Sequence, residues 1–225
     1  MSTTSDLIAQ AQLYAFVDTA YLHGRDPTSI VRQLCEGGAD LIQLRAKGES
    51  PEKVRLLAEQ LLPITHSFNV PLVINDHLEV AQTVSAPICH LGVEDFFGSG
   101  YEAISQLPRP AHGGHMPLVG LSTHSPDQAR KAVGAGAAYI GVGPVYPTDT
   151  KPTAKAVTLD YVRWAARNVV IPWFAIGGIH LDNLDDVLAA GARRICVVSA
   201  ILNQQDLAHA CQQFKSRLPS LPKLT

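Results

Sequence analysis

Short apolar segments alternate with longer amphipathic segments along the whole chain. The short segments are rich in Val, Ile, Leu and aromatic residues and show little polar alternation, which is typical of strands buried on both faces. They predict strands at 13–17, 41–45, 71–75, 88–91, 118–121, 139–142, 172–176 and 194–198. The amphipathic segments predict helices at 29–36, 52–62, 78–85, 101–106, 127–135, 159–168, 184–190 and 207–217.

Start and stop signals support several of these helices. Ser125-Pro126 places a capping hydroxyl before a proline that suits a first helical turn. Three predicted helices end at a glycine followed by alanine, as left-handed C-terminal caps do: Gly38-Ala39, Gly136-Ala137 and Gly191-Ala192. This recurrence indicates a repeated strand–helix unit.

Eight strands alternating with eight helices in 225 residues predict an α/β protein with a closed (β/α)₈ barrel of the TIM type. The alternative is an open, doubly wound sheet. The first strand–helix turn lacks the G-x-G-x-x-G pattern, which weakens the dinucleotide-binding form of that alternative. No linker or change of composition divides the chain, so we expect one catalytic domain over 1–225 with its core at about 13–217.

Composition and charge narrow the function classes. The chain is 46% hydrophobic and 17% charged with a formal net charge of −2, which excludes wholesale disorder and argues against a nucleic-acid or polybasic membrane binder. No apolar stretch approaches the ~20 residues that span a bilayer, and residues 1–10 do not resemble a signal peptide. The cysteines (Cys35, Cys89, Cys196 and Cys211) are widely spaced, so we expect no disulfide framework and a cytoplasmic location.

Polar residues follow most of the predicted strands. In barrels of this kind, active sites form at the carboxyl ends of the strands, so these residues are expected to share one rim. A single polar strand end would be unremarkable as a solvated turn, but here six or seven occur together. The residues at the strand ends include Gln43, Arg45, Lys47, Asn75, Asp76, Asp95 and Ser122.

Two of these residues, Asp76 and Asp95, predict a metal site. They are hard oxygen ligands after neighbouring strands, and a sparse carboxylate pair suits Mg²⁺, which shares its coordination shell with water and substrate phosphates. The alternative is that each aspartate only caps a helix. The nearby cations Arg45, Lys47 and Lys151 favour a more negative group between them, such as a diphosphate.

A second anion site is predicted across the rim. Gly177-Gly178 and Val198-Ser199 follow the last two strands, where barrels of this type often bind phosphate. The loop after the sixth strand adds Thr148, Thr150 and Lys151. Taken alone, the glycine pair is compatible with a plain tight turn and the loop with a solvated one. Together with the metal site, they predict two phosphorylated ligands and a transfer between them.

The motifs resemble, in order, those of the thiamine-phosphate synthase (thiamine-phosphate pyrophosphorylase) family. The resemblance covers about residues 13–202, and its most specific part is the run Y-I-G-V-G-P-V-Y-P-T-D-T-K at 139–151. The other matching motifs are Q-L-R-A-K, I-N-D, H-L-G-V-E-D, G-L-S-T-H, A-I-G-G-I and V-V-S-A-I.

The resemblance implies a Mg²⁺-dependent barrel transferase of thiamine biosynthesis. It would join hydroxymethylpyrimidine diphosphate to hydroxyethylthiazole phosphate by a dissociative displacement that releases diphosphate. The pyrimidine diphosphate would be held by Gln43, Arg45, Lys47, Asn75, Ser122 and Lys151, of which Arg45, Lys47, Ser122 and Lys151 are the expected catalytic residues. Mg²⁺ would be bound by Asp76 and Asp95, and the thiazole phosphate by Thr148, Thr150, Gly178, Val198 and Ser199.

Two positions depart from the family pattern. Val93 stands where the family commonly has Gln, and His77 stands where Arg is usual; neither change removes an expected ligand. The related thiazole tautomerases and a non-catalytic thiamine-phosphate sensor remain alternatives, although neither requires the complete diphosphate site. The expected partners are small molecules, and a homo-oligomer is compatible with the sequence.

Four histidines are further candidates for chemistry. His112 and His115 have the spacing of a zinc pair but lack a third ligand nearby, so we expect no zinc there. His90 is expected to pack at the end of its strand. His124 lies near the predicted site without an assigned role.

Overall fold

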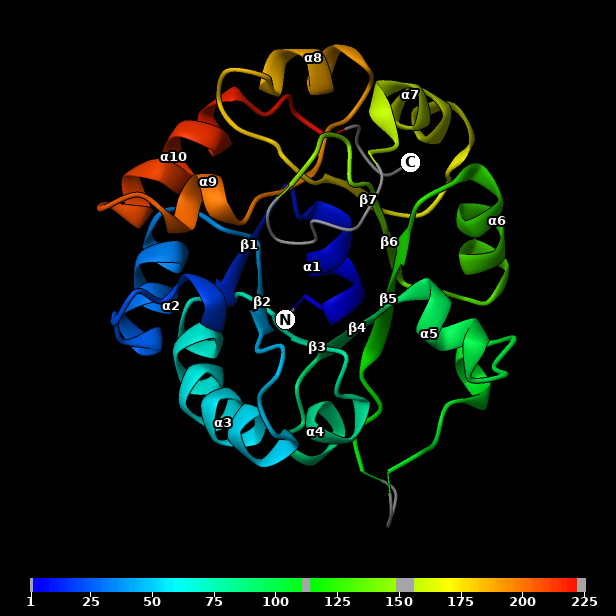
Figure 1. Ribbon diagram of the computed structural model, residues 1–225. Helices are drawn as coiled ribbons and strands as arrows, with labels where there is room; N and C mark the ends of the chain where they lie inside the picture. Colours follow the sequence, from blue (N-terminus) through cyan, green and yellow to red (C-terminus); the bar gives the residue numbers. More distant parts are fainter. Residues whose placement is uncertain (1, 111–113, 149–155, 222–225) are drawn as a thin grey trace.

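A computed structural model describes residues 2–110, 114–148 and 156–221. Eight parallel strands pair in sequence order and close into a barrel ringed by helices (Figure 1). This confirms the predicted (β/α)₈ barrel and excludes the open sheet. The strands are β1 (Leu13–Asp18), β2 (Leu41–Arg45), β3 (Leu72–Asn75), β4 (Ile88–Leu91), β5 (Leu118–Thr123), β6 (Tyr139–Val142), β7 (Trp173–Ile176) and β8 (Ile195–Cys196).

The helices that follow the strands pack around this barrel. Their bounds are α2 (Pro27–Glu36), α3 (Pro51–Ser67), α4 (Leu78–Thr83), α5 (Val93–Gly98), α6 (Pro126–Gly134), α7 (Thr158–Asn168), α8 (Leu184–Ala189), α9 (Ser199–Leu202) and α10 (Leu207–Arg217). A helix α1 (Thr4–Gln10) precedes β1, and two 3₁₀ helices are η1 (Thr19–Tyr21) and η2 (Ile104–Gln106).

One predicted helix is wrong. The segment 101–106 forms only the short η2, and the helix between β4 and β5 is α5, which begins eight residues earlier at Val93. Val93 and Phe96 are buried on its inner face. The helix ends before Gly100, which adopts a left-handed φ of 85° that stops helical propagation.

Of the other predicted elements, two differ most in length from the prediction. Strand β8 keeps only two residues of the predicted 194–198. Helix α3 runs past Pro63 to Ser67, although the sequence places its end at 62. Ala58, Leu61 and Thr65 are buried at helical spacing, so packing against the barrel carries the helix through the proline.

The predicted helix signals are confirmed. Ser125 Oγ accepts the Gln128 N–H at the start of α6. Gly38, Gly136 and Gly191 all have left-handed φ angles, of 87°, 86° and 103°. These residues turn the chain from a helix into the next strand, which is why the Gly-Ala pair recurs.

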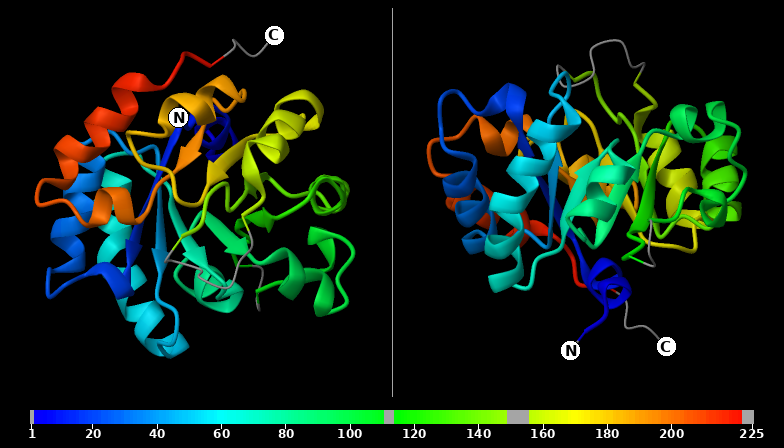
Figure 2. Two further views of the ribbon diagram at one scale, coloured as in Figure 1. Left: turned by 45° about the horizontal axis from the view of Figure 1, so that its top comes forward. Right: turned by 90° about the horizontal axis from the view of Figure 1, so that it is seen from below.

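Helix α1 lies at one end of the barrel, immediately before the first strand begins (Figure 2). At this end Asp40 accepts the N–H groups of Gln12 and Leu13, both at 2.8 Å, and pairs with Lys215 of α10. The amino end of β1 is therefore fixed by structural contacts. No helix within the described ranges is long and apolar enough to cross a membrane.

Candidate active site

A cavity of about 440 Å³ opens at the carboxyl ends of the strands. Every predicted site residue that the structure describes lines it: Gln43, Arg45, Lys47, Asn75, Asp76, Asp95, Ser122, Thr148, Gly178, Val198 and Ser199. The predicted residues Thr150 and Lys151 lie outside the described residues, as does His112 of the rejected zinc pair. The barrel thus gathers segments more than 150 positions apart in the sequence.

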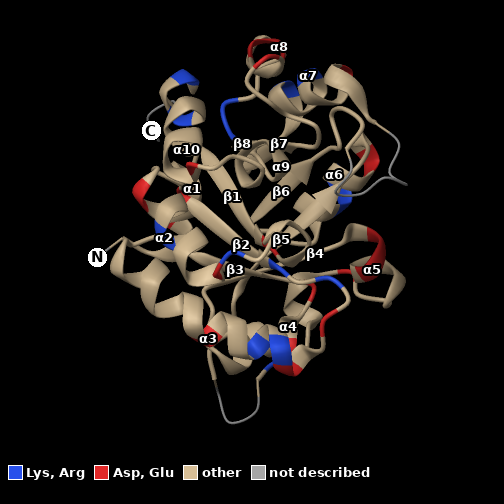
Figure 3. Cartoon of the chain, turned by 60° about the vertical axis from the view of Figure 1, so that its left-hand side comes forward, with Lys and Arg blue, Asp and Glu red and all other residues tan. Residues whose placement is uncertain are grey.

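Cations and carboxylates meet at the ends of β2 and β3. Arg45, the last residue of β2, donates from Nη1 to Asp18 Oδ2 at 2.6 Å. Lys47 Nζ lies 3.8 Å from Asp76 Oδ2, which also accepts the Asn75 side-chain amide at 2.7 Å. Elsewhere, Lys and Arg are interspersed with Asp and Glu on the outer helices (Figure 3). The local mixture of charges fits an anion bound together with a cation.

The structure does not support the alternative that the two aspartates are helix caps. Helix α4 follows His77 and helix α5 follows Gly92, and neither start has a side-chain cap. A Cβ built on Gly92 would lie 2.5 Å from Asp95 Oδ2, so the bare glycine gives the carboxylate room beside the cavity. Asp76 holds a left-handed φ of 64°, which is uncommon for a residue other than glycine.

The carboxylates at the cavity suit Mg²⁺ better than a metal whose ligands all come from the protein. Among the described residues, no group of three or more His, Cys, Asp or Glu side chains could hold a metal ion. Asp76 and Asp95 instead provide two carboxylates that line the cavity. Mg²⁺ is commonly bound by one or two carboxylates, with waters and substrate phosphates completing its shell. The residues present therefore fit a magnesium ion shared with a phosphorylated ligand.

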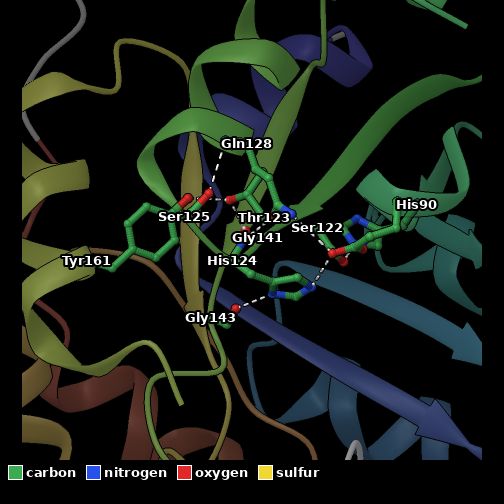
Figure 4. Close-up of polar contacts among 10 residues, drawn as sticks. His90, Ser122, Thr123, His124, Ser125, Gln128, Gly141, Gly143 and Tyr161 are labelled. Atoms are coloured by element: carbon green, nitrogen blue, oxygen red, sulfur yellow. Dashed lines mark hydrogen bonds and ion pairs between the residues drawn. The ribbon is translucent and has the colours of Figure 1, made fainter. Parts of the chain in front are cut away.

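A chain of buried polar side chains crosses the barrel beneath the cavity. Gln43 Nε2 donates to the Tyr14 hydroxyl, which lies 2.9 Å from the Tyr139 hydroxyl. Tyr139 contacts His90 Nδ1 at 3.0 Å. His90 Nε2 contacts Ser122 Oγ at 2.9 Å, and both residues are labelled in Figure 4. Five strands thus contribute one side chain each, so the barrel core fixes the position of Ser122.

His90 is uncharged within this chain. Burial lowers the pKa of His90 to about 4, so its ring is neutral at pH 7 and has one donor and one acceptor nitrogen. Gln43 Nε2 donates to the Tyr14 hydroxyl, and the hydrogen bonds between Tyr14, Tyr139 and His90 Nδ1 continue the chain. His90 Nε2 and Ser122 Oγ share its last hydrogen bond, which holds the Ser122 side chain at the cavity.

Little in the sequence points to this chain. Tyr14 and Tyr139 are only residues of predicted strands there, and the expectation for His90 is packing at the end of its strand. Both tyrosines are almost completely buried, and burial raises their phenol pKa values well above 10. The available signal was a tyrosine at a similar position in two predicted strands, which is also typical of plain core packing.

His124 connects two loops of the rim. Its Nδ1 donates to the Gly143 carbonyl oxygen after β6, as Figure 4 shows. Its Nε2 lies 3.7 Å from Glu94 Oε1, and Gln128 donates to the same oxygen at 3.2 Å. The residue left without a role by the sequence thus holds the start of the β6 loop against the segment that carries Asp95.

The opposite wall is formed by closely packed backbone. Gly177 and Gly178 have left-handed φ angles of 101° and 62°. A Cβ on Gly177 would lie 2.4 Å from Pro144 Cβ, and one on Gly178 would lie 2.6 Å from the Pro147 carbonyl oxygen. The Tyr146 N–H donates to the Gly177 carbonyl at 3.1 Å. Glycine is required here because the loops after β6 and β7 are in backbone contact.

Comparisons with known proteins agree with this geometry. Residues 13–201 match the family model described as thiamine monophosphate synthase. The chain is 43% identical to a thiamine-phosphate synthase from Thermus thermophilus, over 81% of this chain and 84% of that protein. It is 36% identical to one from Halalkalibacterium halodurans, over 92% and 95%. A solved thiamine phosphate pyrophosphorylase from Pyrococcus furiosus superposes with a TM-score of 0.76 at 28% identity, over 93% and 96% of the two chains.

Proposed function

The chain belongs to the thiamine monophosphate synthase family of transferases, and we propose that it joins hydroxymethylpyrimidine diphosphate to hydroxyethylthiazole phosphate. The products would be thiamine monophosphate and diphosphate. One observation carries the proposal: a single cavity is lined on one side by Arg45, Lys47, Asp76 and Asp95, and on the other by the Gly177-Gly178 turn. Such a cavity has room for two anionic reactants facing each other.

The diphosphate end of the pyrimidine substrate would bind among the cations. Arg45 offers a planar fork for phosphate oxygens, and Lys47 a compact charge; Lys151 would complete the set. Asn75 and Gln43 add amide groups. Ser122, which His90 holds at the cavity, would form a hydrogen bond with an oxygen of the diphosphate or with a pyrimidine nitrogen, without a covalent role.

Asp76 and Asp95 would hold Mg²⁺ beside these cations. When bound, the ion supplies positive charge that stabilises the departing diphosphate oxygens. Arg45, Lys47 and Lys151 would stabilise the same developing charge from their own positions, without reorganising during the reaction.

The thiazole phosphate would bind at the opposite wall. Its phosphate contacts there would be Thr148, Thr150, Gly178, Val198 and Ser199. Anchoring this distant phosphate places the thiazole nitrogen in line with the pyrimidine methylene carbon. The carbon–oxygen bond to diphosphate breaks, the ring delocalises the resulting charge, and the nitrogen lone pair forms the new carbon–nitrogen bond. Because that nitrogen carries no proton, the step needs no protein base, and positioning can supply up to ~7–11 kcal/mol.

Turnover assays test this function. With both substrates and Mg²⁺, we expect thiamine monophosphate to form, and EDTA to abolish its formation. Asp76→Ala and Lys151→Ala should each lower turnover by about 100-fold or more while the fold is kept. Asp127→Ala is the matched control, because this exposed carboxylate pairs with Arg130 of the same helix, α6, and is not one of the residues that line the cavity. It should leave turnover unchanged.

Each failure has a distinct meaning. Isomerisation of a thiazole phosphate without use of the pyrimidine substrate would identify a tautomerase instead. Binding of thiamine monophosphate without any turnover would identify a sensor. Normal turnover of Asp76→Ala or Lys151→Ala would refute the metal–diphosphate assignment.

Three further properties belong to the proposal. We place the enzyme in the cytoplasm, an assignment supported by its four free, buried cysteines. We take residues 13–217 as the core of one catalytic domain, as the continuous barrel and the family match over 13–201 support. A homo-oligomer stays a prediction.

A further inference from the structure

We infer that Asp18 is a positioning residue that fixes the guanidinium of Arg45 for binding a diphosphate. The inference rests on the proposed function, because it assigns Arg45 an anionic ligand. Asp18 ends β1, and its register partner on β2 is Arg45. The Asp18 side chain is only 1% exposed, whereas Arg45 lines the cavity. Asp18 therefore acts from behind the residue that meets the ligand.

Both oxygens of the Asp18 carboxylate are engaged. Oδ2 accepts from Arg45 Nη1 at 2.6 Å, and Oδ1 accepts the Ala20 N–H at 3.0 Å, which caps the η1 turn. A guanidinium is planar, so fixing one of its nitrogens orients the whole fork. The capping bond fixes the carboxylate in turn. Arg45 is thus oriented by a group that cannot itself rotate.

A second arginine holds the η1 turn in place. Arg25 donates from Nη2 to the carbonyls of Tyr21 and Leu202, and from Nε to the carbonyl of Leu22 at 3.1 Å. Its Nη1 reaches the Gln204 carbonyl at 3.2 Å. The turn is therefore attached to the end of α9, on the side of the barrel that carries Ser199. The frame behind Arg45 therefore includes the last turn of the helix that begins at the cavity residue Ser199.

Two physical effects of Asp18 oppose each other. Its negative charge reduces the net attraction of Arg45 for an anion, while its geometry prevents the arginine side chain from sampling other rotamers. A paired guanidinium binds phosphate oxygens well only when its fork is aligned. We expect the alignment of the Arg45 fork to outweigh the negative charge of Asp18. Removal of the Asp18 carboxylate should therefore weaken diphosphate binding.

Asp18→Asn separates these effects. The amide has one acceptor oxygen where the carboxylate has two, so Ala20 N–H and Arg45 Nη1 compete for it. We expect the KM for the pyrimidine diphosphate to rise about 10-fold to 100-fold, by analogy with the range seen when a residue that orients a metal ligand is mutated. The KM for the thiazole phosphate should stay within about twofold. Tighter binding of the diphosphate would show that charge prevails and would overturn the inference.

A double-mutant cycle tests whether Asp18 acts through Arg45. Arg45→Lys keeps the charge but loses the fork, and should itself raise the KM for the pyrimidine diphosphate. Adding Asp18→Asn to Arg45→Lys should then cost little more. Losses that simply multiply would refute the positioning role. If Asp18→Asn does not fold, Arg45→Lys alone tests the inference. An unchanged KM of Arg45→Lys for the pyrimidine diphosphate would show that the guanidinium fork is not needed, and would refute a positioning role for Asp18.

Asp40→Asn is the matched control for a structural aspartate. Asp40 also accepts two backbone N–H groups and pairs with a cation, Lys215, but at the opposite end of the barrel. The Asp40→Asn variant should lower the midpoint of urea unfolding without changing the KM for either substrate. If Asp18→Asn behaves in the same way, Asp18 is a structural residue only.

A binding measurement separates this inference from the proposed function. Titration calorimetry with inorganic diphosphate and Mg²⁺ requires no turnover, and Asp18→Asn should weaken the affinity by the same 10-fold to 100-fold. An inactive wild-type protein that shows this loss would refute the proposed function but keep the role of Asp18. If the wild-type protein is active and Asp18→Asn binds diphosphate as tightly as the wild type, only the positioning role of Asp18 is refuted.

Discussion

Acidification should destabilise the barrel through His90, which the core keeps neutral. Its ring nitrogens contact Tyr139 and Ser122, and only 9% of the residue is exposed. Burial lowers the pKa of His90 to about 4, from an ordinary value of 6.5. Between these two values the unfolded chain binds a proton that the folded barrel rejects. The free energy of unfolding must therefore fall as the pH drops through this interval.

The magnitude follows from the two pKa values. At pH 7.5 neither state binds the proton, so His90 contributes almost no pH dependence. At pH 5.0 the difference between 6.5 and about 4 lowers the free energy of unfolding by about 2 kcal/mol. Below pH 4 the loss approaches its limit of about 3 kcal/mol. This is a large share of the ~5–15 kcal/mol that keeps a typical protein folded.

Urea unfolding at pH 7.5 and 5.0 measures this loss. The wild-type barrel is compared with His90→Gln, whose amide makes hydrogen bonds but does not titrate. The contributions of all other titrating groups cancel between the two proteins. Between pH 7.5 and 5.0 the free energy of unfolding of the wild type should therefore fall by about 2 kcal/mol more than that of the variant. The exposed His66→Gln should behave like the wild type. An equal pH dependence of the free energy of unfolding in the wild type and His90→Gln would refute this prediction. If the glutamine side chain does not fit the site, His90→Asn replaces it as the variant that does not titrate.

Two further predictions concern packing. Gly177→Ala should lower the free energy of unfolding by about 1–3 kcal/mol in urea, because φ is 101° and the new Cβ would lie 2.4 Å from Pro144 Cβ; an unchanged midpoint would contradict the close contact of the two loops. The thiols should react with a colorimetric thiol reagent only after unfolding, because all four are buried and burial raises the pKa of Cys35, Cys89 and Cys211 to about 12. Rapid labelling of the native protein at pH 8 would contradict this.

The sequence alone determined the architecture of this protein. Strands buried on both faces appear as continuous apolar runs, and Gly136 and Gly191 mark where a helix turns into the next strand. These are local properties, so one chain suffices to identify them. Where a local signal was weak, the prediction failed: the helix at 101–106 was misplaced because Val93 and Phe96 take up the inner face earlier.

The sequence also predicted which polar residues line the cavity, since the carboxyl ends of the strands share one rim of a barrel. Arg45, Asp76 and Asp95 were selected in this way, and the structure places all three in one cavity. Their roles as ligands of diphosphate and metal stay predictions, with the family membership as support.

Only the tertiary structure decided which buried residues contact and orient the side chains that line the cavity. Asp18 meets Arg45 because β1 and β2 are in register, and His90 meets Ser122 across neighbouring strands. Tyr14 and Tyr139 lie 125 positions apart, yet their hydroxyls share a hydrogen bond. No local pattern distinguishes such a tyrosine from one that only fills the core. Closure of the barrel brings these side chains into contact, because it sets the register of every strand against its neighbours.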